Sequence, residues 1–147
     1  MKQRGIKIGE VLVLEGVLKK EQLDAALQIQ KTTGDFLGDI LVKRKWASED
    51  QISAALSKQF DIPFCALNFD KIDWEVVKEH ELLLVEKNCF PFSQDGDSIT
   101  VMIFNPLDAL TISQIESQVG GRAVNLVLST KTQIGEAIKE FKRRSLM

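Results

Sequence analysis

The first third of the chain contains one sequence pattern written twice, and this duplication constrains the fold more than any other feature. The tripeptide Ala-Ala-Leu at residues 25–27 recurs 29 residues later at residues 54–56. Gly9 recurs at the same offset as Gly38. Self-similarity at a fixed offset in a short chain is typical of a structural unit that has been duplicated. We therefore expect two copies of one small helical unit.

Each copy predicts a short helix, a tight turn and a longer helix. In the first copy, apolar residues at helical spacing end at Gly16, which is well placed as the residue that follows a helix. In the second copy, Ser48 and Gln51 form a capping-box pattern that predicts the start of the longer helix. Residues 32–35, Thr-Thr-Gly-Asp, predict a turn between the copies.

The second half of the chain changes its periodicity. After Asp61-Ile62-Pro63-Phe64, short apolar runs alternate with turn residues, and Gln94-Asp95-Gly96-Asp97 indicates a hairpin. The sequence therefore predicts an α+β protein with an all-helical subdomain at residues 1–60, built from a duplicated helix-turn-helix unit, and a small β-β-α-β-α subdomain at residues 61–147. The elements expected in the second subdomain are an extended segment at 65–69, a helix at 74–82 capped by Asp73, strands at 89–92 and 99–104, a helix at 110–119, a strand at 124–128 and a helix at 130–144.

Composition excludes several classes of protein. Hydrophobic residues make up 44% of the 147 residues and charged residues 27%, as in soluble globular proteins. A net charge of −2 argues against a protein that coats nucleic acid. Cys65 and Cys89 stand alone, so neither a disulfide framework nor a metal motif is predicted. With no apolar run long enough to span a bilayer and no signal-peptide pattern at the N-terminus, we expect a cytoplasmic protein.

The residues that could support catalysis are few. The sequence contains neither a Gly-x-x-x-x-Gly-Lys phosphate loop nor a Gly-x-Ser-x-Gly nucleophile motif. The single histidine, His80, lies among charged residues and is predicted to be on the surface. With no tyrosine as well, the sequence predicts a protein that is not an enzyme and that holds neither a metal nor a cofactor.

The polar residues of the repeats suggest a binding site instead. Gly9 and Gly38 each stand near the start of a predicted helix, where backbone N–H groups and the helix dipole favour an anion. Gln30 and Gln59 each end a copy with an amide that can both donate to and accept from the edge of a base. Two such units would match a cyclic dinucleotide, which has two phosphates and two bases. In the alternative explanation, which periodicity alone favours, the glycines ease helix packing and the glutamines face water.

Residues 7–59 resemble the MshEN domain, which is found at the N-terminus of bacterial type II secretion and type IV pilus assembly ATPases. The signature of this family is Arg-Leu-Gly-x-x-Leu-x-x-x-Gly followed by Leu, Leu and Gln at fixed spacing, and it occurs twice with a short spacer. Residues 61–147 are similar to the rest of this N-terminal domain. The first copy here is Lys7-Ile8-Gly9, Leu12, Gly16, Leu23, Leu27 and Gln30, and the second is Phe36-Leu37-Gly38, Leu41, Lys45, Ile52, Leu56 and Gln59.

The resemblance implies that cyclic di-GMP binds across the two copies. Lys7 and Phe36 would lie over the bases, and Gly9 and Gly38 would give access to the backbone. Asp39 could accept a hydrogen bond from a guanine edge, and Asp108 is a weaker candidate from the second subdomain. The full set of implied ligand-binding residues is Lys7, Ile8, Gly9, Leu23, Leu27, Gln30, Phe36, Leu37, Gly38, Asp39, Ile52, Leu56, Gln59 and Asp108.

Two residues depart from the signature. Lys7 replaces the family arginine and loses its planar fork. Lys45 replaces the second turn glycine and adds charge near the site, and a left-handed conformation there would cost about 1 kcal/mol.

The resemblance implies a regulatory domain that reports cyclic di-GMP to a secretion or pilus assembly ATPase or to an inner-membrane platform protein. It would not insert into the membrane or bind a nucleic acid polymer. The alternative is the same fold with decayed ligand motifs, which would act as a docking module for such a partner.

Overall fold

The computed structural model describes residues 8–146. The chain divides into two compact units, Met1–Asp61 and Ile62–Met147, and each is described by itself. That these units are separate domains stays a prediction. Within the described residues, no helix combines the length and the apolar character that crossing a membrane requires.

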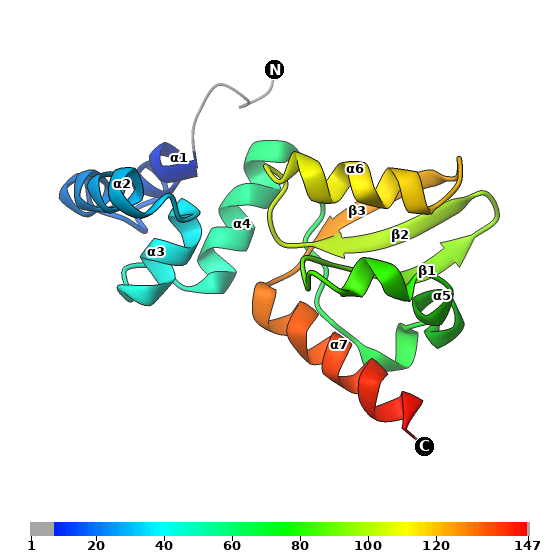
Figure 1. Ribbon diagram of the computed structural model, residues 1–147. Coiled ribbons are helices and arrows are strands. Elements are labelled where there is room, and N and C mark those ends of the chain that lie inside the picture. The colour runs from blue at the N-terminus through cyan, green and yellow to red at the C-terminus, as the bar shows by residue number, and fades with distance from the viewer. Residues whose placement is uncertain (1–7, 147) are drawn as a thin grey trace. The chain divides into compact units, whose positions relative to one another are not determined.

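The first unit is all-helical, and its helices repeat at the offset seen in the sequence. The short helices α1 and α3 have equivalent first and last residues, and the longer helices α2 and α4 begin at equivalent residues (Figure 1). Helix α1 packs against α4, and α2 packs against α3. The bounds are α1 (Ile8–Leu14), α2 (Lys20–Thr33), α3 (Leu37–Lys43) and α4 (Glu49–Phe60).

The turn inside each repeat has the same backbone geometry. The N–H of Val17 donates to the carbonyl of Leu12 at 3.0 Å, and the N–H of Trp46 donates to the carbonyl of Leu41 at 3.0 Å. The residue before each donor is left-handed: Gly16 has φ 77° and Lys45 has φ 60°. Lys45 therefore adopts the left-handed conformation that is costly for a residue whose side chain has a Cβ atom.

The starts of the longer helices are less alike. At α4 the Ser48 hydroxyl accepts from Gln51 N at 3.1 Å and the Gln51 side chain accepts from Ser48 N at 2.9 Å, which confirms the predicted capping box. At α2 the Gln22 side chain accepts from Lys19 N at 2.9 Å. Lys19 carries no acceptor atom on its side chain, so only half of a capping box is possible there.

The second unit is built on a three-stranded sheet with the order β1-β2-β3. Strands β1 and β2 form an antiparallel hairpin around Gly96, and β3 is parallel to β2 after the crossover helix α6. Together with the helical first unit, this confirms the predicted α+β fold with its β-β-α-β-α order. The bounds are η2 (Phe69–Lys71), α5 (Trp74–Glu79), η3 (Glu81–Leu84), β1 (Cys89–Asp95), β2 (Ser98–Ile103), α6 (Ala109–Gln118), β3 (Ala123–Leu128) and α7 (Lys131–Ser145).

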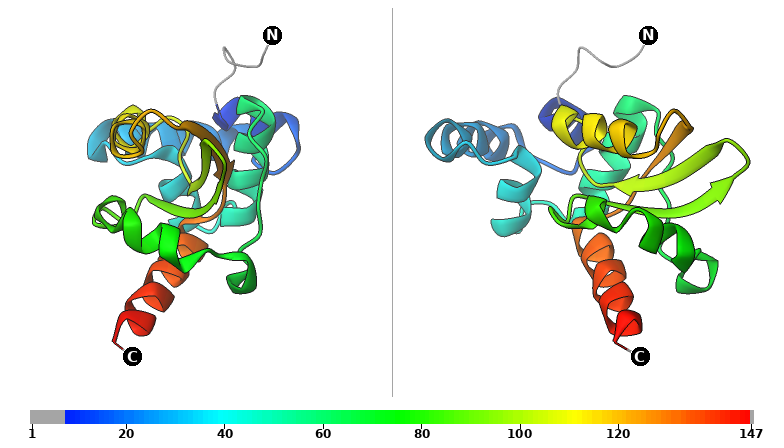
Figure 2. Two further views of the ribbon diagram at one scale, coloured as in Figure 1. Left: turned by 90° about the vertical axis from the view of Figure 1, so that its right-hand side faces the viewer. Right: turned by 45° about the vertical axis from the view of Figure 1, so that its right-hand side comes forward.

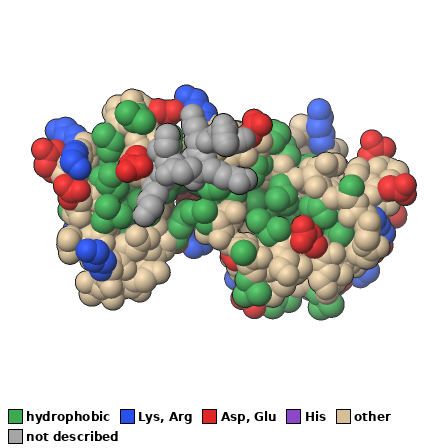
Figure 3. Space-filling view, turned by 90° about the horizontal axis from the view of Figure 1, so that it is seen from above, with side chains coloured by type: hydrophobic (Ala, Val, Ile, Leu, Met, Phe, Trp, Pro, Cys, Tyr) green, Lys and Arg blue, Asp and Glu red, His purple; other side chains and the backbone are tan. Residues whose placement is uncertain are grey.

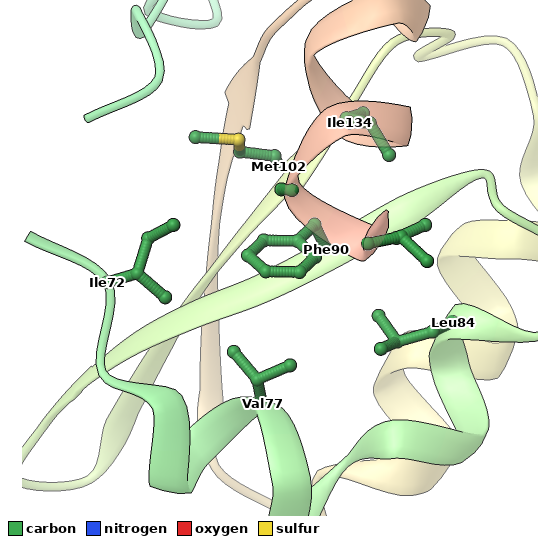
Figure 4. Close-up of a cluster of buried hydrophobic side chains, with 8 residues drawn as sticks. Ile72, Val77, Leu84, Phe90, Met102 and Ile134 are labelled. Carbon is green, nitrogen blue, oxygen red and sulfur yellow. The ribbon is translucent and has the colours of Figure 1, made fainter. Parts of the chain in front are cut away.

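Helices cover both faces of this sheet. Helix α6 lies over one face, and α5 and α7 lie over the other (Figures 1 and 2). Because side chains alternate along a strand, β2 contributes to both cores. On the α7 side, Met102 of β2 packs with Phe90 of β1, Val77 of α5 and Ile134 of α7 (Figure 4).

Two local predictions for the second unit were wrong. The helix predicted at 74–82 ends at Glu79 and is followed by the 3-10 helix η3. His80, which was predicted to be on the surface, lies at this junction and is only 5% exposed. Its backbone N–H donates to the carbonyls of Val76 and Val77, which holds the residue against the core. Burial is the main cause of its lowered pKa, so the imidazole is neutral near pH 7.

The two cysteines differ in environment. Cys89 is 2% exposed, and burial, together with the charge of Asp108, raises the pKa of its thiol to about 12. Cys65 is half-buried and packs beside the α7-side core. Among the described residues, no group of His, Cys, Asp and Glu side chains is arranged to hold a metal ion.

Candidate ligand-binding site

The two signature glycines lie where helices of the first unit approach closely. A Cβ atom on Gly9 would stand 2.4 Å from Cδ1 of Leu23, and a Cβ atom on Gly38 would stand 3.2 Å from Cγ2 of Ile52. Leu23 and Ile52 occupy equivalent positions in the two repeats. In each copy the glycine therefore lets the short helix pack onto the first apolar signature residue of the longer helix. This contact gives the glycines a packing role, as the alternative explanation expected.

The apolar signature residues are not equally accessible. Leu23 and Ile52 are buried, with 8% and 6% of their surface exposed. Leu56 is fully buried, whereas Leu27, its equivalent, is 37% exposed. Of these four apolar residues in the predicted ligand-binding set, Leu27 therefore presents the largest exposed fraction.

The two signature glutamines also differ. Gln30 is half-buried, and its Nε2 donates to the backbone carbonyl of Asp35 at 3.0 Å. This bond ties the end of the first repeat to the spacer between the two copies, residues 31–35. Gln59 is 6% exposed, so neither glutamine simply faces water as the alternative explanation supposed.

The remaining predicted residues of this unit gather at the starts of the short helices. Ile8 is buried in α1, and Leu37 is buried in α3. Phe36 is the N-cap residue of α3, and its carbonyl accepts from Asp39 N at 3.0 Å. The Phe36 ring lies against Gly38, with Cε2 2.9 Å from the position of a Cβ atom on that glycine. The structure thus brings Phe36, Gly38 and Asp39 together in the first turn of α3.

Two predictions concern lysines that replace signature residues. Lys7 lies outside the residues that the structure describes. Lys45 is exposed in the turn after α3, whereas Gly38 lies in the first turn of that helix. A helix rises about 1.5 Å per residue, so the two positions are about 10 Å apart along α3.

Asp108 belongs to the second unit and has a local structural role there. It is the N-cap residue of α6, and its Oδ1 accepts from Thr111 N at 3.1 Å. Its Oδ2 accepts from the Thr111 hydroxyl at 2.7 Å. Both carboxylate oxygens therefore hold the start of α6. A ligand contact from this residue stays a prediction.

One contributor to this arrangement was missed by sequence reasoning. The acceptor for Gln30 is the backbone carbonyl of Asp35, and a backbone carbonyl leaves no residue-type signature. The Thr-Thr-Gly-Asp turn predicted at residues 32–35 was the sign in the sequence that this segment has a fixed conformation.

Known proteins resemble this chain over most of its length. The MshEN domain family matches residues 60–146. The match to a structure of MshE with cdg (cyclic di-GMP) covers 92% of this chain and 98% of the MshE chain, with 25% sequence identity and a TM-score of 0.82. The match to the N-terminal domain of XpsE covers 95% of both chains, with 14% sequence identity and a TM-score of 0.66. This match shows a likeness of fold alone.

Two type IV pilus assembly ATPases named PilB are also similar. The protein from Myxococcus xanthus is 26% identical over 136 residues, which are 92% of this chain and 24% of the relative. The protein from Thermus thermophilus is 30% identical over 120 residues, which are 78% of this chain and 13% of the relative. This chain therefore spans only a minor part of the length of these relatives.

These matches differ in which part of the chain they cover. The family match falls on the second unit, although the motifs that suggested the family lie at residues 7–59. The match to MshE covers 92% of the chain, so it must include most of the helical repeats.

Proposed function

Because the chain belongs to the MshEN domain family, we propose that its helical repeats bind cyclic di-GMP and that the chain acts as a regulatory domain. The observation that carries this proposal is the likeness to MshE with cdg, at a TM-score of 0.82 over 92% of the chain. The repeated signature supports the same assignment, since both copies retain the glycine and the final glutamine.

In this proposal the first turn of α3 forms part of one half of the site. Phe36 would stack on a base, and Asp39 would accept from the guanine edge, because a carboxylate is an acceptor and the N1 and N2 positions of guanine carry hydrogens. The proximity of the Phe36 ring, Gly38 and Asp39 supports such a role. Lys7 would take the place of Phe36 in the other half.

Gln30 would contribute to the first half. Its bond to the Asp35 carbonyl uses one of the two N–H groups of its amide and leaves the side-chain oxygen as an acceptor. Leu27 beside it, 37% exposed, would contact the flat face of a base. Leu23, Ile52 and Leu56 would form the deeper apolar wall, and Gln59 would contribute from the second copy.

Calorimetric titration with cyclic di-GMP tests this proposal. We expect saturable binding to protein at tens of micromolar, and no heat above dilution would overturn the proposal. Gln30→Ala should weaken binding about tenfold, because a lost hydrogen bond in a formed site costs about 1–2 kcal/mol. Gln28→Ala is the matched control, since Gln28 is an exposed glutamine on the same helix outside the signature.

A second pair of variants tests the lysine that replaces the family arginine. Lys7→Ala should weaken binding, whereas Lys20→Ala should leave it unchanged. The Lys20 side chain is 77% exposed and lies outside the signature. If binding occurs but neither Lys7→Ala nor Gln30→Ala changes the affinity, the residue assignment is wrong even though the ligand is right.

We further propose that the domain is cytoplasmic, has no catalytic activity of its own, and serves a type IV pilus or type II secretion ATPase or an inner-membrane platform protein. The likeness to two PilB ATPases supports this context. The rival function is a docking module whose ligand motifs have decayed. It is favoured by one observation, the position of the family match on the second unit rather than on the repeats. A chain that binds such a partner but not cyclic di-GMP would establish the rival.

A further inference from the structure

The turn between α3 and α4 differs from its counterpart in the first repeat in every side chain but not in backbone geometry. The first repeat has Leu14-Glu15-Gly16-Val17 and the second has Lys43-Arg44-Lys45-Trp46. Equivalent hydrogen bonds close the two turns: Gly16 N donates to Val13 O at 3.0 Å, and Lys45 N donates to Val42 O at 3.0 Å. Since the first repeat forms this backbone without any basic residue, the fold does not require the basic run.

Two physical effects make the turn sequence of the second repeat unfavourable for stability. Lys45 adopts φ 60°, a left-handed conformation in which a residue with a Cβ atom is strained and glycine is not. Three consecutive cations also repel one another. Lys43, Arg44 and Lys45 are all exposed, and none forms an ion pair with another residue between 8 and 146. These charges are therefore available to an outside partner.

The same turn offers a place for an apolar side chain. The Arg44 guanidinium lies over the Trp46 ring, 5.8 Å from its centroid, and Trp46 is half-buried. A shallow hollow beside the ring is lined by Val42, Lys45, Trp46, Ala47, Ser48, Glu49 and Gln51. The carboxylates that follow in the chain, Glu49 and Asp50, lie in the first turn of α4, where the helix dipole already favours negative charge.

We propose that this basic turn, residues 42–51, is a docking site for an acidic protein segment that carries an apolar residue among its carboxylates. The planar fork of Arg44 suits a carboxylate, Lys43 and Lys45 add positive charge on either side of it, and the hollow beside Trp46 takes the apolar side chain. Arginine and tryptophan are also the residues that contribute most to protein interfaces. This surface is separate from the proposed nucleotide site, because it lies at the opposite end of α3 from Gly38.

An acidic protein segment fits better than the other anionic macromolecules. Membrane-binding basic segments contain about four to eight cations, and only three are present here. Proteins that bind nucleic acid polymers typically carry an extended basic face, which a run of three cations in a chain with a pI near 5.5 does not provide. Neither of them requires a hollow beside the cations for an apolar side chain.

The test uses a fluorescent synthetic peptide in which single leucines alternate with pairs of glutamates, and fluorescence anisotropy measures its binding to the full chain at low salt. We expect saturable binding that weakens as salt rises and that a peptide with glutamine in place of glutamate does not show. Lys43→Gln combined with Arg44→Gln should weaken binding about tenfold, since each exposed charge contributes a few-fold. Lys20→Gln, at an exposed lysine outside the turn, should leave it unchanged.

The variant Lys45→Gly separates a loss of peptide binding from a loss of stability. It should raise the melting temperature, because the strain at Lys45 is removed, and yet weaken peptide binding about threefold. Unchanged peptide affinity in Lys45→Gly and in the double variant would overturn the proposal, as would equal binding of the glutamine peptide.

Two further probes test other anionic partners, and a third tests whether the two sites are separate. Phosphatidylserine vesicles and single-stranded DNA should bind more weakly than the peptide, and stronger binding of either one through Lys43 and Arg44 would overturn the choice of partner. Saturating cyclic di-GMP should not displace the peptide, and displacement would overturn the separation of the two sites. Because the peptide assay needs no nucleotide, the docking proposal can fail or succeed independently of the proposed function.

Discussion

The two repeats of the first unit share the geometry of their short helix and turn but differ in which side chains they bury. Their short helices begin and end at equivalent residues, and each is followed by a left-handed residue, Gly16 in the first repeat and Lys45 in the second. Yet Leu27 is 37% exposed where Leu56 is fully buried. The repeated signature therefore specifies a local helix-turn-helix geometry. The packing around each copy determines whether an equivalent leucine lies in the core or at the surface. The four predictions that follow test this division of roles.

The largest difference should appear when the equivalent leucines are truncated. Leu56→Ala should lower the free energy of unfolding by about 3 kcal/mol, because a fully buried side chain leaves a cavity. Leu27→Ala should cost about 1 kcal/mol or less, since its side chain already meets solvent. Urea denaturation of the two variants measures both values.

Leu12 and Leu41 provide the matched control for this comparison. Both are fully buried at equivalent positions, so Leu12→Ala and Leu41→Ala should destabilise the protein by similar amounts. Equal losses in Leu27→Ala and Leu56→Ala would contradict the asymmetry between the repeats.

Hydrophobic periodicity and turn residues were enough to predict the duplicated helices, the hairpin and the final amphipathic helix. These features depend on neighbours in the chain, such as Ser48 with Gln51 and the turn around Gly96. The asymmetry between Leu27 and Leu56 could not be predicted, because identical residues in identical local patterns differ only in what packs over them. The burial of His80 was missed for a related reason. Its charged neighbours suggested solvent, whereas the junction between α5 and η3 turns the imidazole inward.

The proposed nucleotide site shows the same limit. The family signature named residues such as Phe36 and Gln30, but not the spacer carbonyl of Asp35 that fixes Gln30. The basic turn was also overlooked as a unit, although its sign was in the sequence. Comparing residues 43–46 with their equivalents at 14–17 reveals the change from one acidic residue to three basic ones.

Exchanging the left-handed residues should shift stability in opposite directions. Gly16→Lys should lower the free energy of unfolding by about 1.5 kcal/mol, because a side chain enters a conformation that suits glycine. Lys45→Gly should raise it by about 1 kcal/mol through relief of the same strain. Thermal and urea unfolding would detect both changes. If Lys45→Gly is destabilising, Lys45 makes stabilising contacts that outweigh its backbone strain.

The helix caps should respond in the same reciprocal way, with smaller effects. Ser48→Ala should cost about 1 kcal/mol, because Gln51 N loses its side-chain acceptor. Lys19→Ser should stabilise α2 by somewhat less than about 1 kcal/mol, since the Gln22 half of a capping box is already in place. Lys20→Ser, one residue further on, serves as the control and should show no gain. The cap explanation is wrong if Lys19→Ser and Lys20→Ser have equal effects on the melting temperature.

The smallest effect should come from the ion pair that joins the two repeats. Lys58 Nζ lies 2.8 Å from Glu15 Oε2, linking α4 to the turn after α1, and the two side chains are 66% and 30% exposed. A double-mutant cycle with Glu15→Gln and Lys58→Gln should give a coupling of about 0.5 kcal/mol, because solvent weakens pairs at this exposure. The coupling should shrink further at high salt. A coupling several times larger would mean that charge holds the two repeats together, rather than the packing of α1 against α4 and of α2 against α3.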